Sequence, residues 1–177
     1  VLIDRAHPLQ EGAPPELVPV DRLHPQVLLE RRAARLLAAC IQAAGGAREI
    51  VPVSGWRSQA EQQAIWEDTL QRRGEAFTRQ YVAVPGCSEH QTGLALDIVD
   101  ASYQILDQGQ EDTLVQQWLI EHSWEYGFVL RYPNAKSEIT GIIYEPWHYR
   151  YVGREAAREM TELDLCLEEY VDWLSAQ

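Results

Sequence analysis

Two short segments, far apart in the chain, both carry side chains that bind metal ions, and the fold has to accommodate both. Residues 88–97 have the sequence SEHQTGLALD, and residues 145–148 have the sequence EPWH. A catalytic zinc ion takes three protein ligands from His, Asp, Glu or Cys and keeps a fourth position open. His90, Asp97 and His148 supply such a set. We therefore expect the two segments to meet at a one-metal site of the kind that peptidases use.

Local patterns indicate how each segment is held. Residues 94–99 form an apolar run that predicts a strand, and this strand would carry the aspartate on a rigid element. Residues 141–144 predict a second strand, which Pro146 interrupts because proline has no N–H to donate to a sheet. A β-bulge at that point would direct both functional side chains of the second segment into one cleft.

Glu145 supplies the remaining part of such a site. A metal ion makes water acidic, but a nearby carboxylate still has to take the proton and pass it to the leaving amine. Glu145 precedes His148 by three residues and is predicted to have this role. A single His beside a single Asp is more often an ordinary hydrogen-bonded pair. The combination of three ligands with a base favours the metal site.

Further motifs surround these two segments, at residues 54–58 (SGWRS), 126–128 (YGF), 131–133 (RYP) and 144–151 (YEPWHYRY). Together, over about residues 5 to 153, the motifs resemble the zinc D-Ala-D-Ala carboxypeptidases of the VanY type. The resemblance implies a compact α+β fold, a bound zinc ion and removal of the C-terminal D-amino acid from cell-wall stem peptides. One departure is Trp56, where the family more usually has Tyr, and this aromatic exchange puts little in doubt.

Arg57 is the predicted clamp for the substrate. Ser58 and Glu61 have the spacing of a capping box, so a helix is expected to begin there with Arg57 at its positive end. A guanidinium beside free helix-start amides binds carboxylates well, although a surface salt bridge would explain Arg57 equally well. The resemblance favours a role in gripping substrate and stabilising the developing oxyanion. It also implies substrate contacts by Gln62, Ser88, Tyr132 and Trp147. Two of these, Tyr132 and Trp147, also suit simple packing.

Hydrophobic periodicity predicts one α+β domain over residues 1–177, with a small antiparallel sheet that carries the zinc site and helices packed around it. The other predicted elements are helices at 27–44, after residue 58, at 111–126 and at 154–174, and strands at 49–53 and 128–130. Prolines make 1–25 an extended segment. Residues 154–177 are expected to be a scaffold helix whose inward side chains are Met160, Leu163, Leu167, Val171 and Leu174.

Cysteine and histidine residues outside the two segments have structural explanations. Cys40 and Cys166 lie on apolar stripes and are expected to be buried thiols, whereas Cys87 adjoins the metal motif without being counted as a ligand. His122 is predicted to pack or to lie at the solvent edge. Three cysteines allow at most one disulfide, so cysteine usage leaves the compartment open.

Composition limits the partners and the location. The chain has 27 acidic and 15 basic residues, a formal net charge of −12, which argues against nucleic acid or an anionic membrane as the main partner. No apolar run is long enough to span a bilayer, and no signal peptide is recognisable. Because the sequence does not begin with Met, we expect that an export signal or anchor was removed. The expected location is extracytoplasmic, with the cytoplasm as the alternative.

The predicted function is that of a zinc-dependent D,D-carboxypeptidase acting on peptidoglycan stem peptides. The same chemistry would serve an L,D-carboxypeptidase or a D,D-dipeptidase, which differ in pocket size and stereochemical fit. The alternative from another class is a non-catalytic, zinc-stabilised binding module. Glu145 argues against that class because a structural zinc site needs no general base.

Overall fold

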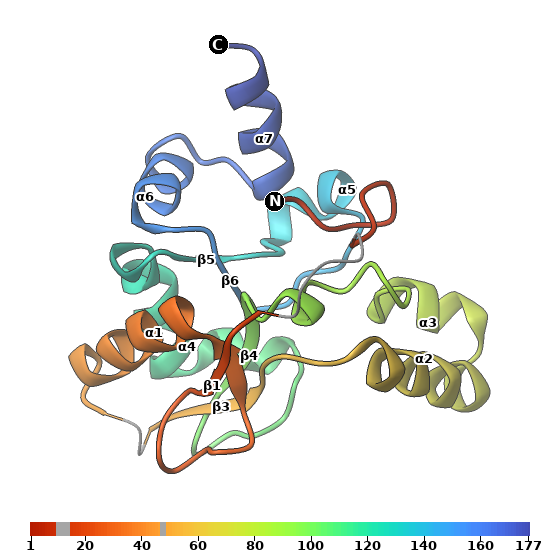
Figure 1. The fold of residues 1–177 in the computed structure, drawn as a ribbon, viewed down its shortest axis with the longest axis horizontal. Helices are drawn as coiled ribbons and strands as arrows, with labels where there is room; N and C mark the ends of the chain where they lie inside the picture. Colours follow the sequence, from red (N-terminus) through yellow and green to blue (C-terminus); the bar gives the residue numbers. More distant parts are fainter. Residues whose placement is uncertain (10–14, 47–48) are drawn as a thin grey trace.

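A four-stranded antiparallel sheet lies at the centre of the computed structural model, which describes residues 1–9, 15–46 and 49–177 (Figure 1). Its strands, in spatial order, are β3 (Ile50–Ser54), β4 (Ala95–Asp100), β6 (His148–Tyr151) and β5 (Phe128–Leu130). A second, two-stranded sheet pairs β1 (Leu17–Pro19) with β2 (Leu28–Glu30). The prediction of an α+β fold with a small antiparallel sheet is confirmed.

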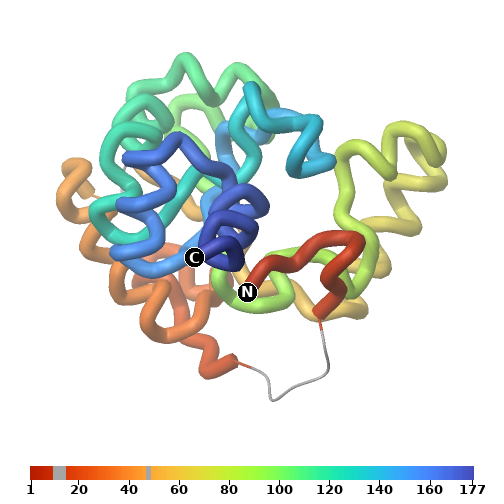
Figure 2. Tube along the Cα trace, turned by 90° about the horizontal axis from the view of Figure 1, so that it is seen from above, coloured from red at the N-terminus to blue at the C-terminus, as the bar shows by residue number. Residues whose placement is uncertain are grey.

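The helices follow in chain order. The α-helices are α1 (Arg31–Ala43), α2 (Gln59–Arg73), α3 (Glu75–Tyr81), α4 (Leu114–His122), α5 (Ser137–Thr140), α6 (Arg154–Glu162) and α7 (Leu167–Ser175). Short 3-10 helices are η1 (Glu89–Thr92), η2 (Gln108–Asp112), η3 (Ser123–Tyr126) and η4 (Asn134–Lys136). In both views α2 and α3 project together from one side of the molecule (Figures 1 and 2). No helix of the described residues is both long and apolar enough to cross a bilayer.

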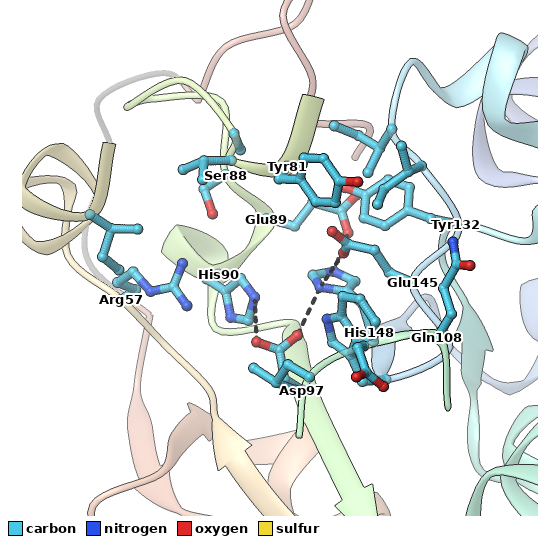
Figure 3. Close-up of a pocket in the computed structure, with 18 of the residues that line it drawn as sticks. Arg57, Tyr81, Ser88, Glu89, His90, Asp97, Gln108, Tyr132, Glu145 and His148 are labelled. Atoms are coloured by element: carbon cyan, nitrogen blue, oxygen red, sulfur yellow. Dashed lines mark hydrogen bonds and ion pairs between the residues drawn. The ribbon is translucent and has the colours of Figure 1, made fainter. Parts of the chain in front are cut away.

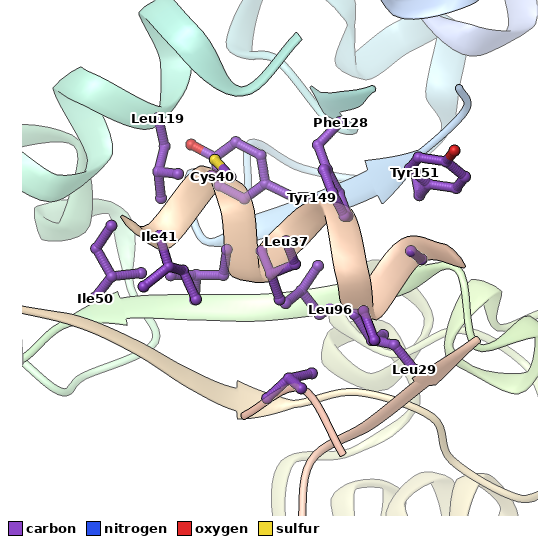
Figure 4. Packing of buried hydrophobic residues seen from close by; sticks show 14 of the residues in the cluster. Leu29, Leu37, Cys40, Ile41, Ile50, Leu96, Leu119, Phe128, Tyr149 and Tyr151 are labelled. Atoms are coloured by element: carbon purple, nitrogen blue, oxygen red, sulfur yellow. The ribbon is translucent and has the colours of Figure 1, made fainter. Parts of the chain in front are cut away.

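Side-chain alternation gives the sheet two different faces, because successive residues of a strand point in opposite directions. On one face Leu96 and Ile98 of β4 and Tyr149 of β6 pack with Leu37 of α1 and Leu119 of α4 (Figure 4). This is the main hydrophobic core. The intervening residues of the same strands therefore point to the opposite face.

The opposite face is partly covered by the C-terminal helices. Val129 of β5 packs there with Ala157 and Met160 of α6 and with Leu167 and Tyr170 of α7. The first residues of the chain lie beside α7 in both views (Figures 1 and 2), and Leu2 packs against this second cluster. The face that carries the functional side chains therefore also carries a small core of its own.

Several predicted elements are confirmed. Strands form at 95–100, 128–130 and 50–54, and Ser58 and Glu61 form the predicted capping box at the start of α2. Helix α1 is confirmed but begins at Arg31, because 28–30 pair with β1 first. The predicted helix at 111–126 consists of α4 flanked by η2 and η3. Part of the predicted extended N-terminal segment, at 10–14, lies outside the described residues.

The predicted strand at 141–144 is wrong. Gly141 has the left-handed φ of 70° that ends α5, and the following residues form an irregular segment. The strand forms at 148–151 instead. The predicted bulge is also absent there, since His148 N–H donates to the Glu145 carbonyl at 3.1 Å and closes a turn before β6. A turn, and not a bulge, brings Glu145 beside His148, which is the first residue of β6.

The single C-terminal helix predicted for 154–174 is also wrong, because it is broken into α6 and α7. Asp164 between them has a φ of 52°, a left-handed conformation that interrupts helical hydrogen bonding. The break shifts the phase of the second helix. Met160 and Leu167 are buried as predicted, whereas Leu163 and Leu174 are exposed.

Close backbone contact joins the small sheet to the start of α2. The Trp56 N–H donates to the Leu28 carbonyl at 2.6 Å. A Cβ atom on Gly55 would lie 2.3 Å from that same carbonyl oxygen, which no side chain tolerates. Glycine at position 55 therefore lets the segment before α2 run directly against β2. This contact fixes the position of the Arg57 backbone.

Candidate active site

Asp97 and His148 are direct neighbours on adjacent strands. The register pairs Asp97 of β4 with His148 of β6, and both point to the face opposite the main core. His148 Nδ1 lies 3.1 Å from Asp97 Oδ1, and both side chains are less than 10% exposed. Antiparallel pairing alone therefore produces two of the three predicted ligands.

His90 reaches the same point from η1. Its Nδ1 lies 2.7 Å from the Gly55 carbonyl oxygen, so this nitrogen carries the proton and donates. The other ring nitrogen, Nε2, then presents a lone pair and lies 3.5 Å from Asp97 Oδ2. Gly93 ends η1 with a left-handed φ of 71°, so the chain turns directly from the His90 helix into β4.

The three side chains fit a zinc ion. One nitrogen or oxygen atom from each of His90, Asp97 and His148 lies within 4.8 Å of the others. Tetrahedral ligands at zinc distances stand about 3.3 Å apart, close to the two His–Asp separations here. The hydrogen bond from His90 Nδ1 to a backbone carbonyl is the outer contact that metal-ligating histidines usually make.

Protonation of the ligands is consistent with this reading. Burial opposes charge on His148, but its contacts with Asp97 and Glu89 outweigh burial and raise the pKa of the ring to about 9. Burial likewise opposes charge on Asp97, yet the two histidines hold the pKa of its carboxyl well below the usual range. A metal ion takes the place of the shared proton in such a group, so metal and proton compete for this site.

Glu145 is held beside the ligands by the turn before β6. Its N–H donates to the Tyr132 carbonyl at 3.2 Å, and its Oε2 lies 3.8 Å from His148 Nδ1. Burial is the largest influence on this side chain and raises the pKa of its carboxyl to about 7. A bound divalent cation would lower that value. The group is thus a buried carboxylate next to the ligands, and its nearest positively charged neighbour among the described residues is the ligand His148 itself.

Arg57 lies across the site from Glu145 (Figure 3). Its Nη1 donates to Gln62 Oε1 and its Nη2 to Ser54 Oγ, each at 2.8 Å. Gln62 is buried, and its amide nitrogen donates to the Ala83 carbonyl at 2.7 Å. Both ends of Gln62 are therefore occupied in orienting the guanidinium, while its predicted contact with substrate stays a prediction.

All predicted site residues line one cleft of about 870 Å³. This volume is near the upper end of the roughly 300–1,000 Å³ of small-molecule pockets. The Ser88 oxygen points toward the space between Arg57 and His90 in Figure 3. Tyr132 packs its ring 5.0 Å from that of His148. The cleft is also lined by Arg73, Phe77 and Tyr81 and by several residues between 103 and 109.

A group of buried charges beside the ligands was not predicted. Glu89 is 2% exposed and lies between Arg131 and Arg150, and Arg131 also binds Glu168 of α7. Glu89, Arg131 and Arg150 belong to motifs that the sequence analysis singled out, but no role was predicted for them. The arginines could have been noticed, because Arg131 directly follows the apolar strand β5 and Arg150 lies within β6, where an ordinary surface charge is not expected.

Residues that were expected to have structural roles lie in packed or buried positions. His122 packs on Trp118, with ring centroids 4.8 Å apart, and pairs with Glu125 away from the cleft. Cys40 and Cys166 are buried free thiols, as predicted. Cys87 is half-buried and free.

Sequence comparison places these features in a family. A sequence model of the VanY family, described as D-alanyl-D-alanine carboxypeptidase, matches residues 26–154. The bifunctional D-Ala-D-Ala dipeptidase and D-Ala-D-Ala carboxypeptidase VanXYC of Enterococcus gallinarum is 39% identical, and the match covers 98% of this chain and 94% of the relative. A D-alanyl-D-alanine carboxypeptidase of Enterococcus faecalis is 45% identical over 69% of the chain, which spans 47% of that longer protein.

Solved structures agree in fold. The vancomycin-resistance D,D-dipeptidase VanXYg, in complex with a phosphinate analogue of D-Ala-D-Ala, matches 99% of this chain and 71% of its own, with 39% identity and a TM-score of 0.92. A mutant of the D,D-pentapeptidase VanY from a VanB-type resistance cassette, in complex with Zn(II), matches 97% of both chains, with 35% identity and a TM-score of 0.83.

We expect the protein to bind one equivalent of zinc through His90, Asp97 and His148. The variants His90→Ala and His148→Ala should each lose most of this binding, because two remaining ligands rarely hold zinc firmly. Metal analysis after zinc loading and dialysis provides the measurement. His24→Ala is the control, since His24 forms an ordinary pair with Asp21 at 3.0 Å elsewhere. Less than about half an equivalent in the wild type would contradict the assignment.

Proposed function

Since the chain belongs to the VanY family of D-alanyl-D-alanine carboxypeptidases, we propose that it is a zinc-dependent D,D-carboxypeptidase that removes the C-terminal D-amino acid from peptidoglycan stem peptides. One observation carries the proposal. A three-ligand metal set, a buried carboxylate and an arginine face one another across a single cleft. A non-catalytic binding module would have no use for Glu145, whose burial beside the ligands is energetically costly.

The residues divide the chemistry among themselves. When bound, zinc polarises the scissile carbonyl and makes water acidic enough to attack it near neutral pH. Glu145 takes the proton from the attacking water and returns it to the amine of the departing D-amino acid. Its position 3.8 Å from His148 Nδ1 supports this role, because the reacting atoms have to lie next to the ligands.

Arg57 measures the distance from the chain end. Its guanidinium is held by Gln62 and Ser54 but remains half-buried at the cleft, so it has donors available for a carboxylate. A clamp at a fixed distance from the metal would admit peptides by their C-terminus and would also stabilise oxyanion charge. Ser88, Tyr132 and Trp147 line the same cleft and complete the proposed substrate pocket.

A second activity has a specific observation in its favour. The relative VanXYC is named as both a dipeptidase and a carboxypeptidase and matches this chain over nearly its whole length. The free dipeptide D-Ala-D-Ala presents the same terminal carboxylate and scissile bond, so the same residues would serve. The volume of the cleft, about 870 Å³, favours longer peptides as the main substrate. An extracytoplasmic location belongs to this proposal, whereas use of the free dipeptide would suit the cytoplasm.

The proposal is tested with substrates of defined length and stereochemistry. We expect the zinc-loaded protein to release D-Ala from a stem pentapeptide ending in D-Ala-D-Ala with a higher kcat/KM than it shows for the free dipeptide. A tetrapeptide with a single terminal D-Ala should be cleaved least. The measurement is released D-Ala under equal zinc loading. Preference for the tetrapeptide would contradict the D,D assignment and favour an L,D-carboxypeptidase.

Glu145→Gln should keep zinc but lose turnover. The amide preserves shape but cannot accept the proton, and general acid–base groups contribute about 10²- to 10⁴-fold. We expect a fall of that size in kcat, with zinc content unchanged by metal analysis. Glu138→Gln, a change at an exposed residue of helix α5, is the control. Activity within about threefold of the wild type would show that the base lies elsewhere.

Arg57→Ala should lower kcat/KM by about 30- to 1,000-fold, as expected for loss of a shielded charged contact. Arg57→Lys should recover only part of this, since an ammonium lacks the planar fork. The decisive measurement compares a peptide with a free C-terminus to its C-terminal amide. The wild type should reject the amide, and Arg57→Ala should treat both alike. Arg72→Ala is the control, because Arg72 forms only an exposed ion pair with Asp68. Equal cleavage of acid and amide by the wild type would refute the clamp.

A further inference from the structure

Glu89 occupies the space behind the metal ligand His148. Its Oε1 accepts from Arg131 Nε at 2.7 Å and lies 2.7 Å from Arg150 Nη1. Its Oε2 lies 3.7 Å from His148 Nε2. These two atoms are buried, and neither has a hydrogen-bond partner within the described residues. They face each other slightly beyond hydrogen-bond distance.

The two unpartnered atoms indicate which ring nitrogen of His148 carries a proton. Its Nδ1 points at Asp97 and the ligand group, so Nε2 is the nitrogen left to carry a proton. A buried N–H needs an acceptor, and the only carboxylate oxygen that the described residues place within 4 Å of His148 Nε2 is Glu89 Oε2. A carboxylate that accepts from the second nitrogen of a metal-ligating histidine fixes its tautomer and ring orientation.

Glu89 is itself held from the C-terminal helix. Arg131 donates through Nε to Glu89 and through Nη1 and Nη2 to the two oxygens of Glu168, at 2.8 and 2.6 Å. Its guanidinium is 1% exposed and uses all three nitrogens. Glu168 lies in the first turn of α7, and its side chain is 14% exposed.

We propose that Glu168 and Glu89, bridged by Arg131, are positioning residues that hold His148 with Nε2 protonated and Nδ1 directed at the metal. The inference rests on the proposed metal site, but not on the identity of the substrate. It gives α7, predicted to be scaffold only, a part in metal binding. Glu168 lies beyond the segment that the family model matches, which ends at residue 154. The metal site of this chain therefore extends outside that family core.

Zinc affinity tests the linkage in a double-mutant cycle. Glu89→Gln, Glu168→Gln and the double variant are compared with the wild type by chelator competition at constant pH. Glu169→Gln is the matched control, because it is the next residue of α7 and pairs with Lys136, and Gln still satisfies its capping position. The control perturbs the same turn without touching Arg131.

We expect Glu89→Gln to weaken zinc affinity by about 10- to 100-fold and Glu168→Gln by about tenfold, as for other outer partners of metal-ligating histidines. In the Glu89→Gln background, the second change should alter affinity by less than about twofold, because Glu168 acts through Glu89. Glu169→Gln should match the wild type. Wild-type affinity in Glu168→Gln, or effects that simply multiply in the double variant, would overturn the proposal.

A second measurement needs no variant and stays decisive if a variant fails to fold. Nitrogen-15 NMR of the zinc-loaded wild type distinguishes a protonated from a metal-bound ring nitrogen. We expect His148 to show a protonated Nε2 and a metal-bound Nδ1. Ligation through Nε2 would overturn the proposal. Absence of zinc binding by the wild type would instead refute the metal site itself, so the two failures are distinguishable.

Discussion

The pairing of β4 with β6 is the contact on which the remaining structure depends. It places Asp97 directly opposite His148, and strand alternation sends the flanking residues of both strands into the main core. The hydrophobic packing of Leu96 and Tyr149 therefore also sets the position of the ligands, since side chains on a pleated strand cannot be re-aimed independently. A one-residue slip would bury Asp97 and His148 in the core.

The other parts of the site attach to this pair through backbone contacts. The Gly55 carbonyl orients His90, and the Arg57 N–H donates to the His90 carbonyl at 3.1 Å, so η1 and the start of α2 are locked together. Leu28 of the small sheet supports the same segment. The predicted clamp and the third ligand are thus positioned by one continuous set of hydrogen bonds, which explains why these two residues can be held rigidly although they lie outside strands.

The sequence indicated which residues gather in one cleft better than it predicted the elements that carry them. Ligand type and spacing are local properties, so His90, Asp97, His148 and Glu145 were recognisable directly. The second ligand strand was misplaced because the apolar residues 141–144 resemble a strand more than His148–Tyr151 does. That strand has polar residues on the site face and tyrosines on the core face, a pattern that only its partners make clear. Nothing in the composition around Asp164 marks the helix break.

The contacts of Glu89 were beyond prediction for a different reason, since its partner Arg131 lies 42 residues away in the sequence.

The contacts of Glu89 also explain why the pKa values of two carboxylates on the same face of the sheet, Glu89 and Glu145, differ. Burial opposes ionisation of both, but Arg150 and Arg131 hold the pKa of Glu89 well below its usual range. Among the described residues no arginine pairs with Glu145, and burial raises the pKa of its carboxyl to about 7. Carboxylates whose environments separate their pKa values in this way take different roles. Glu89 is permanently charged and suits a fixed acceptor. Burial raises the pKa of Glu145, and a carboxylate with a raised pKa is better suited to take up the proton that the proposed hydrolysis releases.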